Sequence, residues 1–90
     1  MYGEEITKEK LDMVDRAEQF LIENGFENER VRIHGNTARI EVLPEDIVKI
    51  ASDGIRQSVY EELKKIGFMF VTLDLKGYAT GSMNSTIDRL

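Results

Sequence analysis

The fold of this 90-residue chain is decided by residues 30–42, RVRIHGNTARIEV. Apolar and charged residues alternate on both sides of the Gly35-Asn36 step, which is typical of two antiparallel strands joined by a tight turn. Alternate side chains of a strand point to opposite faces, so one face of this hairpin is apolar and the other is charged. The apolar set is Val31, Ile33, Ala38, Ile40 and Val42, and the charged set is Arg30, Arg32, Arg39 and Glu41.

A helix is predicted before the hairpin, from Lys8 to Asn24. Thr7 suits its N-cap, and Gly25 suits the position that follows a helix end. Met13 and Phe20 fall on the far side of this helix from its apolar stripe, where they are ordinary surface residues or a small contact patch between chains. At 100° per residue, the stripe expected to face the core is Leu11, Val14, Ala17, Leu21 and Ile22.

Two helices are expected after the hairpin. Pro44 suits the first position of a short helix that ends near Ala51. The Asp53-Gly54 step is expected to separate it from a second helix, which starts at Ile55 and ends at Gly67.

The apolar run at residues 68–75, FMFVTLDL, predicts a third strand that is buried on both faces along most of its length. The order is then α-β-β-α-α-β, which indicates a single α+β domain over residues 1–90. We expect a small, mainly antiparallel three-stranded sheet, with the first hairpin strand at its centre and the helices packed on one face. The opposite face, which carries Arg30 and Arg32, would be left uncovered.

Composition excludes several classes of function. Twelve Lys and Arg against seventeen Asp and Glu give a net charge of −5, the opposite of a general nucleic-acid binder. The chain has no cysteine and one histidine, His34, which excludes disulfides, thiolate metal sites and a multi-histidine zinc site within it. It contains no apolar run long enough to span a membrane and no signal peptide, so a cytoplasmic protein without a membrane partner is expected.

Glu18 is an unusual residue for its position, because its wheel angle lies inside the apolar stripe of the first helix. A carboxylate there is costly unless it is paired or reaches water. Glu18 is therefore either a partly exposed residue at the edge of the stripe or a partner for an arginine or a ligand group.

The arginines of the hairpin are the other candidates for a function. Arg30 and Arg32 leave the same strand face, and Arg39 joins them from the paired strand. Guanidinium groups suit the geometry of phosphate and carboxylate. The alternative is a solvated surface balanced by Glu41. No nucleophile–base pair, acid–base pair or metal site can be assembled from the motifs, so no catalytic residue is assigned.

Three stretches, RVRIHG with ARIE, VTLDLKGY, and Gly81-Ser82-Met83-Asn84, together resemble the C-terminal domain of a family of PP-loop ATP-utilising enzymes. The family is typified by the ATP-dependent sacrificial sulfur transferase of lactate racemase (nickel-pincer) cofactor biosynthesis. The resemblance extends from Tyr2 to about Asn84.

The resemblance implies an enzyme whose N-terminal PP-loop domain uses ATP and Mg²⁺ to adenylate a carboxylate of a pyridinium mononucleotide, followed by sulfur transfer. It matches Arg30 and Arg32 to a phosphate-binding arginine pair and Glu18 to a glutamate near the same site. It also implies a homo-oligomer. Ala79 stands where an arginine is common in the family, which puts the exact substrate in doubt.

The nucleotide-binding Ser-Gly-Gly loop and the sulfur-donor cysteine of the family are absent from this chain. The resemblance therefore implies a C-terminal part of a larger enzyme, which carries no cofactor itself and is inactive alone. The alternative is a stand-alone, non-catalytic module that binds anions or mediates self-association.

Overall fold

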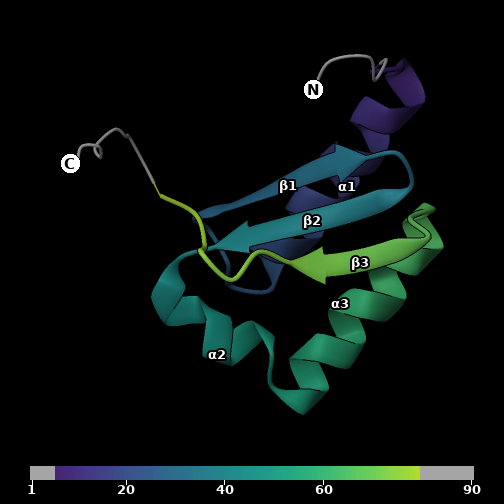
Figure 1. The fold of residues 1–90 in the computed structure, drawn as a ribbon. Coiled ribbons are helices and arrows are strands. Elements are labelled where there is room, and N and C mark those ends of the chain that lie inside the picture. Colours follow the sequence, from purple (N-terminus) through teal and green to yellow (C-terminus); the bar gives the residue numbers. More distant parts are fainter. Residues whose placement is uncertain (1–5, 80–90) are drawn as a thin grey trace.

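The computed structural model describes residues 6–79, and its elements follow the predicted order α-β-β-α-α-β. Figure 1 shows a single sheet with helices behind it. The bounds of the elements are α1 Lys8–Glu23, β1 Glu29–His34, β2 Thr37–Val42, the 3₁₀ turn η1 Pro44–Asp46, α2 Ile47–Ile50, α3 Asp53–Ile66 and β3 Phe70–Leu73.

The sheet has the order β1-β2-β3, so β2 is its central strand and the expectation that β1 is central is wrong. β1 and β2 form the predicted antiparallel hairpin, with Val31 opposite Ile40. β3 pairs with β2 in parallel, with Leu73 opposite Ile40, which makes the sheet mixed rather than mainly antiparallel. The chain reaches β3 through α2 and α3, as a parallel connection requires a crossover. The outer edge of β1 is occupied by α1, so β3 pairs with the other edge of the hairpin, that of β2.

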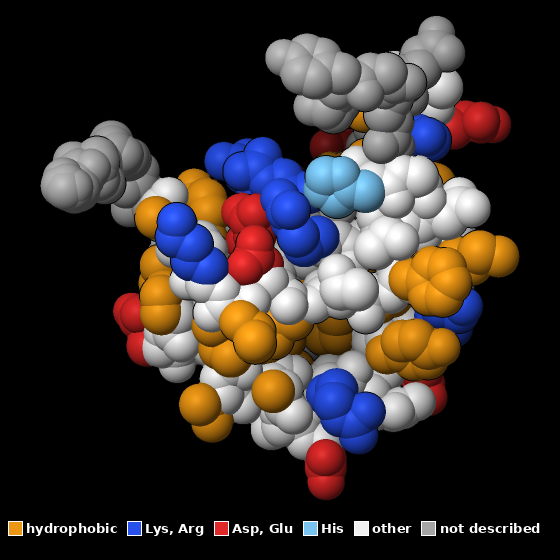
Figure 2. All heavy atoms as spheres, in the orientation of Figure 1, with side chains coloured by type: hydrophobic (Ala, Val, Ile, Leu, Met, Phe, Trp, Pro, Cys, Tyr) orange, Lys and Arg blue, Asp and Glu red, His pale blue; other side chains and the backbone are white. Residues whose placement is uncertain are grey.

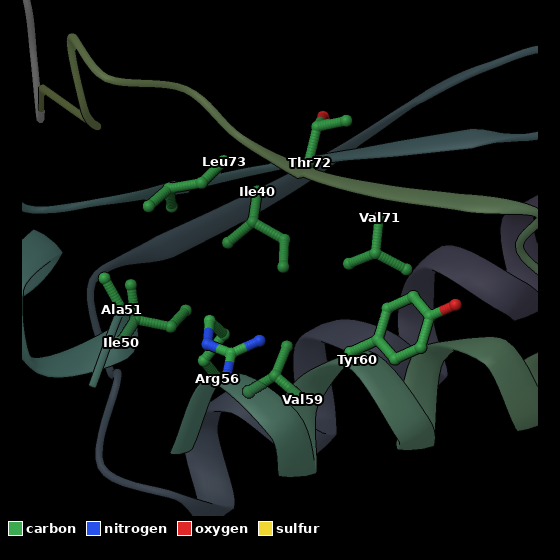
Figure 3. Close-up of a pocket in the computed structure, with 9 residues that line it drawn as sticks. All are labelled: Ile40, Ile50, Ala51, Arg56, Val59, Tyr60, Val71, Thr72 and Leu73. Atoms are coloured by element: carbon green, nitrogen blue, oxygen red, sulfur yellow. The ribbon is translucent and has the colours of Figure 1, made fainter. Parts of the chain in front are cut away.

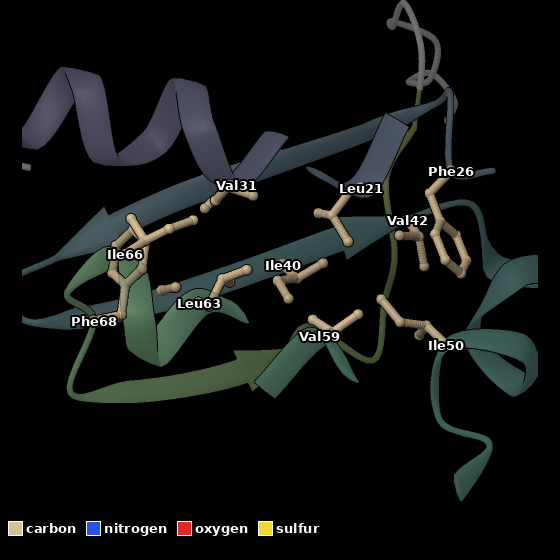
Figure 4. Packing of buried hydrophobic residues seen from close by; sticks show 12 residues of the cluster. Leu21, Phe26, Val31, Ile40, Val42, Ile50, Val59, Leu63, Ile66 and Phe68 are labelled. Atoms are coloured by element: carbon tan, nitrogen blue, oxygen red, sulfur yellow. The ribbon is translucent and has the colours of Figure 1, made fainter. Parts of the chain in front are cut away.

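The core lies between the sheet and the helices, and α1, β1, β2, α2 and α3 each contribute buried residues to it (Figure 4). The apolar face of the hairpin forms the sheet side of the core, as predicted. Its buried residues are Val31, Ala38, Ile40 and Val42, and Ile33 packs against them. The rest of the buried cluster is Ala17, Leu21, Phe26, Ile50, Val59, Leu63, Ile66 and Phe68.

The buried face of α1 is rotated from the predicted stripe. Leu11 and Ile22 are 54 % and 42 % exposed, whereas Met13 and Phe20 pack against the core. The predicted Met13–Phe20 surface patch is therefore wrong. α1 contacts both β1 and α3, and this double contact centres its buried face on Ala17.

Two further boundaries differ from the prediction. α3 begins at Asp53 after the N-cap residue Ser52, so Gly54 lies in its first turn and does not separate two helices. β3 is shorter than predicted and is not buried on both faces. Because the helices pack on one face of the sheet, Val71 and Leu73 are partly buried against the core, whereas Phe70 points the other way and is 60 % exposed. Among residues 6–79, no helix is long and apolar enough to cross a membrane.

Candidate anion-binding face

The sheet face opposite the helices carries the charged residues of the hairpin, as predicted, and is called the open face below. Figure 2 shows blue basic side chains and red carboxylates gathered on one part of it, next to the single pale-blue histidine. The alternation of the strands explains this segregation, because the neighbours of each buried residue point away from the core. The hairpin residues of the open face are Arg30, Arg32, His34, Thr37, Arg39 and Glu41.

Glu41 holds two of the three arginines in place. Its Oε2 lies 3.4 Å from Nε of Arg32 and 3.3 Å from Nη2 of Arg39. A second carboxylate, that of Asp74, lies 3.8 Å from Nε of Arg39. Glu41 is only 8 % exposed, so these pairs are partly shielded from solvent. The charges of Arg32 and Arg39 are thus largely balanced within the fold.

Arg30 differs from the other two, because its partner is a neutral side chain. Its Nη2 donates to the phenol oxygen of Tyr78 at 3.4 Å, and the guanidinium carbon lies 5.6 Å from the centre of the Tyr78 ring. The hydrogen bond to Tyr78 is the main reason why the pKa of Arg30 is raised, with smaller contributions from Glu18 and Glu29. Across residues 6–79, no carboxylate forms an ion pair with Arg30, so its exposed guanidinium is available to an external anion.

Tyr78 reaches Arg30 because the chain after β3 crosses close to the end of β2. The Tyr78 N–H donates to the carbonyl oxygen of Val42 at 2.7 Å. Gly77 makes this crossing possible, since a Cβ there would lie 2.8 Å from the same carbonyl oxygen and 3.3 Å from the ring of Pro44. Its φ of +88° also favours glycine.

Glu18 takes a position at the edge of β1 rather than among the arginines. Its Oε2 accepts a hydrogen bond of 2.9 Å from the backbone N–H of Val31. Because β1 is an edge strand of the sheet that residues 6–79 form, none of its strands lies beside this N–H on that side. Of the three predicted site residues, Arg30 and Arg32 therefore share one face, and Glu18 anchors α1 to the strand that carries them.

Glu29 is a residue that the sequence reasoning missed. It is 9 % exposed, and its Oε1 is buried without a hydrogen-bond partner. Burial, reinforced by the nearby carboxylate of Glu18 and opposed by Arg30, raises the pKa of Glu29 to about 7. The signal was available in the alternation, because Glu29 is two residues before the buried Val31 and so falls on the apolar face.

Tyr78 was also missed as a site residue, although it lies in the VTLDLKGY stretch on which the resemblance rests. Its contact with Arg30 spans 48 residues of sequence, so no local pattern displays it. In the described part of the chain, no group of three or more His, Asp or Glu side chains could hold a metal ion. The open face offers fixed cations and an aromatic ring, which suits binding of an anion rather than bond cleavage.

Comparison with known proteins gives two informative relatives, and no family model matches. The chain is 43 % identical over 98 % of its length to an uncharacterised protein of Synechocystis sp.. It is 39 % identical, again over 98 % of its length, to the pyridinium-3,5-bisthiocarboxylic acid mononucleotide synthase of Lactiplantibacillus plantarum. It covers 33 % of the first and 31 % of the second. The chain therefore spans about a third of the length of the curated relatives it matches.

Proposed function

We propose that this chain is the substrate-binding and assembly part of an ATP-dependent sulfur transferase of the PP-loop type, which acts on the carboxylate of a pyridinium mononucleotide. The observation that carries the proposal is the exposed Arg30, which lies beside Arg32 and has no ion pair within residues 6–79, on a sheet face that no helix of this range covers. The 39 % identity to the L. plantarum synthase supports a pyridinium mononucleotide as the substrate class.

The chemistry of such a substrate fits the open face. A mononucleotide carries a phosphate dianion, and a carboxylate must be activated, for example as an acyl adenylate, before sulfur can replace its oxygen. Arg30 and Arg32 leave one strand about 7 Å apart, which lets two guanidinium groups contact one phosphate and its neighbouring oxygens. Arg30 would supply the free charge. Arg32, already paired with Glu41 at 3.4 Å, would supply directed N–H donors.

Activation and sulfur delivery fall to residues outside this chain in the proposal. The ATP-binding PP-loop domain, with its Mg²⁺, would cover the open face and exclude water, which strengthens the arginine–phosphate contacts. The chain alone should then bind the substrate weakly and catalyse neither ATP–pyrophosphate exchange nor sulfur transfer. Pyrophosphate exchange by the purified chain would contradict the proposal.

The direct test is an NMR titration of the chain with inorganic phosphate and with nicotinate mononucleotide. We expect both ligands to shift the amides of residues 29–42, with binding that weakens as salt is raised. Arg30→Ala should reduce these shifts strongly and leave only weak residual binding, and Arg32→Ala should reduce them less. Arg16→Ala is the matched control, because this arginine is exposed on α1 in a pair with Asp12 and should leave binding unchanged. Equal shifts in wild type and in the Arg30→Ala variant would show that Arg30 does not bind the anion and that the open face is only a solvated surface.

In a full-length relative, the arginine corresponding to Arg30 should affect the mononucleotide and largely spare ATP. Substitution by alanine there should raise the KM for the mononucleotide and leave the KM for ATP within about twofold of wild type, since uniform binding energy appears in KM. An increase confined to the KM for ATP would indicate instead that this arginine binds ATP.

A further inference from the structure

A concave surface lies at the β3 edge of the sheet, between β3 and the helices α2 and α3. Its cavity has a volume of about 300 Å³. Figure 3 shows side chains from β3 above and from α2 and α3 below lining the same space. The floor is apolar, from Ile50, Val59, Val71 and Leu73, and Tyr60 and Arg56 line it from α3. The surface is called the β3 groove below.

The β3 groove coincides with an unpaired strand edge. The N–H groups of Phe70 and Asp74 donate to carbonyl oxygens on the β2 side, at 3.3 and 2.8 Å. Since successive N–H groups of a strand alternate between its two edges, those of Val71 and Leu73 point outward. Within residues 6–79, no strand lies on this outer side of β3.

The helices extend past the sheet at this edge. In Figure 1, α2 and the first half of α3 lie beyond β3, so their inner surface is covered by no strand there. This leaves Tyr60 44 % exposed, and Met69 and Phe70 are 55 % and 60 % exposed at the same edge. Edge strands are usually protected by charges or proline, but residues 70–73, FVTL, contain neither.

The charges of the β3 groove indicate the chemistry of its occupant. Arg56 is the charged residue that lines it, and its exposed ion pair with Asp53, at 3.6 Å, leaves the guanidinium accessible. Lys64 lies farther along α3, outside the lining, with its ammonium 5.8 Å from the centre of the Tyr60 ring and donating to the carbonyl oxygen of Met69 at 3.0 Å. The described residues that line the groove include no carboxylate. A symmetrical pairing of two copies would bring two Arg56 side chains to the shared groove without a lining carboxylate, so an occupant with carboxylates is favoured over a second copy.

We propose that the β3 groove binds an extended peptide segment, which adds a fourth strand beside β3 and presents apolar side chains and a carboxylate to the helices. The backbone of the segment pairs with the outward N–H and C=O groups of Val71 and Leu73. Its inward side chains, two residues apart, contact Val59 and Tyr60, and an acidic side chain pairs with Arg56. This mode of recognition takes affinity from main-chain hydrogen bonds and specificity from alternate side chains. The proposal is independent of the anion site on the open face.

The experiment uses the 90-residue chain and a synthetic peptide, acetyl-Thr-Val-Thr-Val-Thr-Glu-Thr-amide, whose Val, Val and Glu side chains share one face. We expect saturable shifts of the amides of residues 70–74 and of Tyr60 in an NMR titration. A peptide with Lys in place of Glu should bind about two- to fivefold more weakly, as exposed ion pairs allow. In the Arg56→Glu variant this preference should reverse, which a merely sticky apolar surface would not do.

Two controls separate strand addition from nonspecific contact. A peptide N-methylated at alternate residues, on the edge that faces β3, loses its donors and should not bind, whereas N-methylation on the other edge should preserve binding. Arg30→Ala should leave peptide binding unchanged. Equal binding of both N-methylated peptides, an absence of binding by the Glu peptide, or no change of preference in Arg56→Glu would each overturn the proposal.

Discussion

The carboxylate of Glu18 accepts the backbone N–H of Val31 at 2.9 Å, and this bond fixes α1 against the outer edge of β1. An edge strand otherwise presents this N–H to water or to another chain. The helix residue thus takes the place that a further strand would occupy at this edge, and the Val31 that it binds directly follows Arg30 in β1. The placement of the candidate anion site therefore depends on a contact made at the edge of the sheet.

Two replacements of Glu18 should distinguish its role as a hydrogen-bond acceptor from the effect of its negative charge. Glu18→Ala leaves the Val31 N–H without its partner and should lower the free energy of unfolding by about 1–2 kcal/mol. Glu18→Gln keeps an oxygen acceptor and removes repulsion with Glu29, so it should cost less than half as much. Urea denaturation measures both. Glu23→Ala, at an exposed position of the same helix, should stay within about 0.5 kcal/mol of wild type. Equal costs for Glu18→Ala and Glu23→Ala would show that the Val31 contact is not stabilising.

Glu29 should make stability depend on pH near neutrality. Its pKa is raised from 4.5 to about 7, so the native state binds more protons than the unfolded state between these values. The free energy of unfolding should therefore decrease as pH rises from about 4.5 to 7, by at most about 3 kcal/mol from this group. Glu29→Gln should flatten that part of the profile and be more stable than wild type at pH 8. Parallel profiles for the two proteins, measured by denaturation at several pH values, would rule out this role.

The hairpin could be predicted because its signal is local, with strict alternation around Gly35-Asn36. The faces of Arg30 and Arg32 followed from the same alternation. The order of the strands could not be predicted in this way, since it depends on which edge of the hairpin remains open once α1 has packed. For Glu18 the sequence left two alternatives, a partly exposed residue at the edge of the stripe or a partner for an arginine or a ligand group. Glu18 is half-buried, and its partner is a backbone N–H that no sequence pattern displays.

A substitution at Gly54 tests where α3 begins. It lies in the first turn of α3, and a Cβ there would meet nothing within 4 Å. Gly54→Ala should therefore raise the free energy of unfolding by about 0.4–1 kcal/mol, because alanine loses less backbone entropy on folding. Gly77→Ala is the opposed control and should destabilise, owing to its φ of +88° and the 2.8 Å approach to the carbonyl of Val42. A destabilised Gly54→Ala variant would indicate that residues 53–54 form a turn, as the sequence first suggested.

Tyr78 should act on anion binding through Arg30. Tyr78→Phe keeps the ring 5.6 Å from the guanidinium and loses only the 3.4 Å hydrogen bond, so phosphate affinity should fall by no more than about twofold. Tyr78→Leu loses both contacts and should weaken phosphate binding about two- to fivefold, which is the range of an exposed cation–π contact. NMR titration in the Arg30→Ala background provides the control, because contacts that act through one residue are not additive. There, Tyr78→Leu should cause no further loss. A loss of the same size in both backgrounds would mean that Tyr78 contacts the anion independently of Arg30.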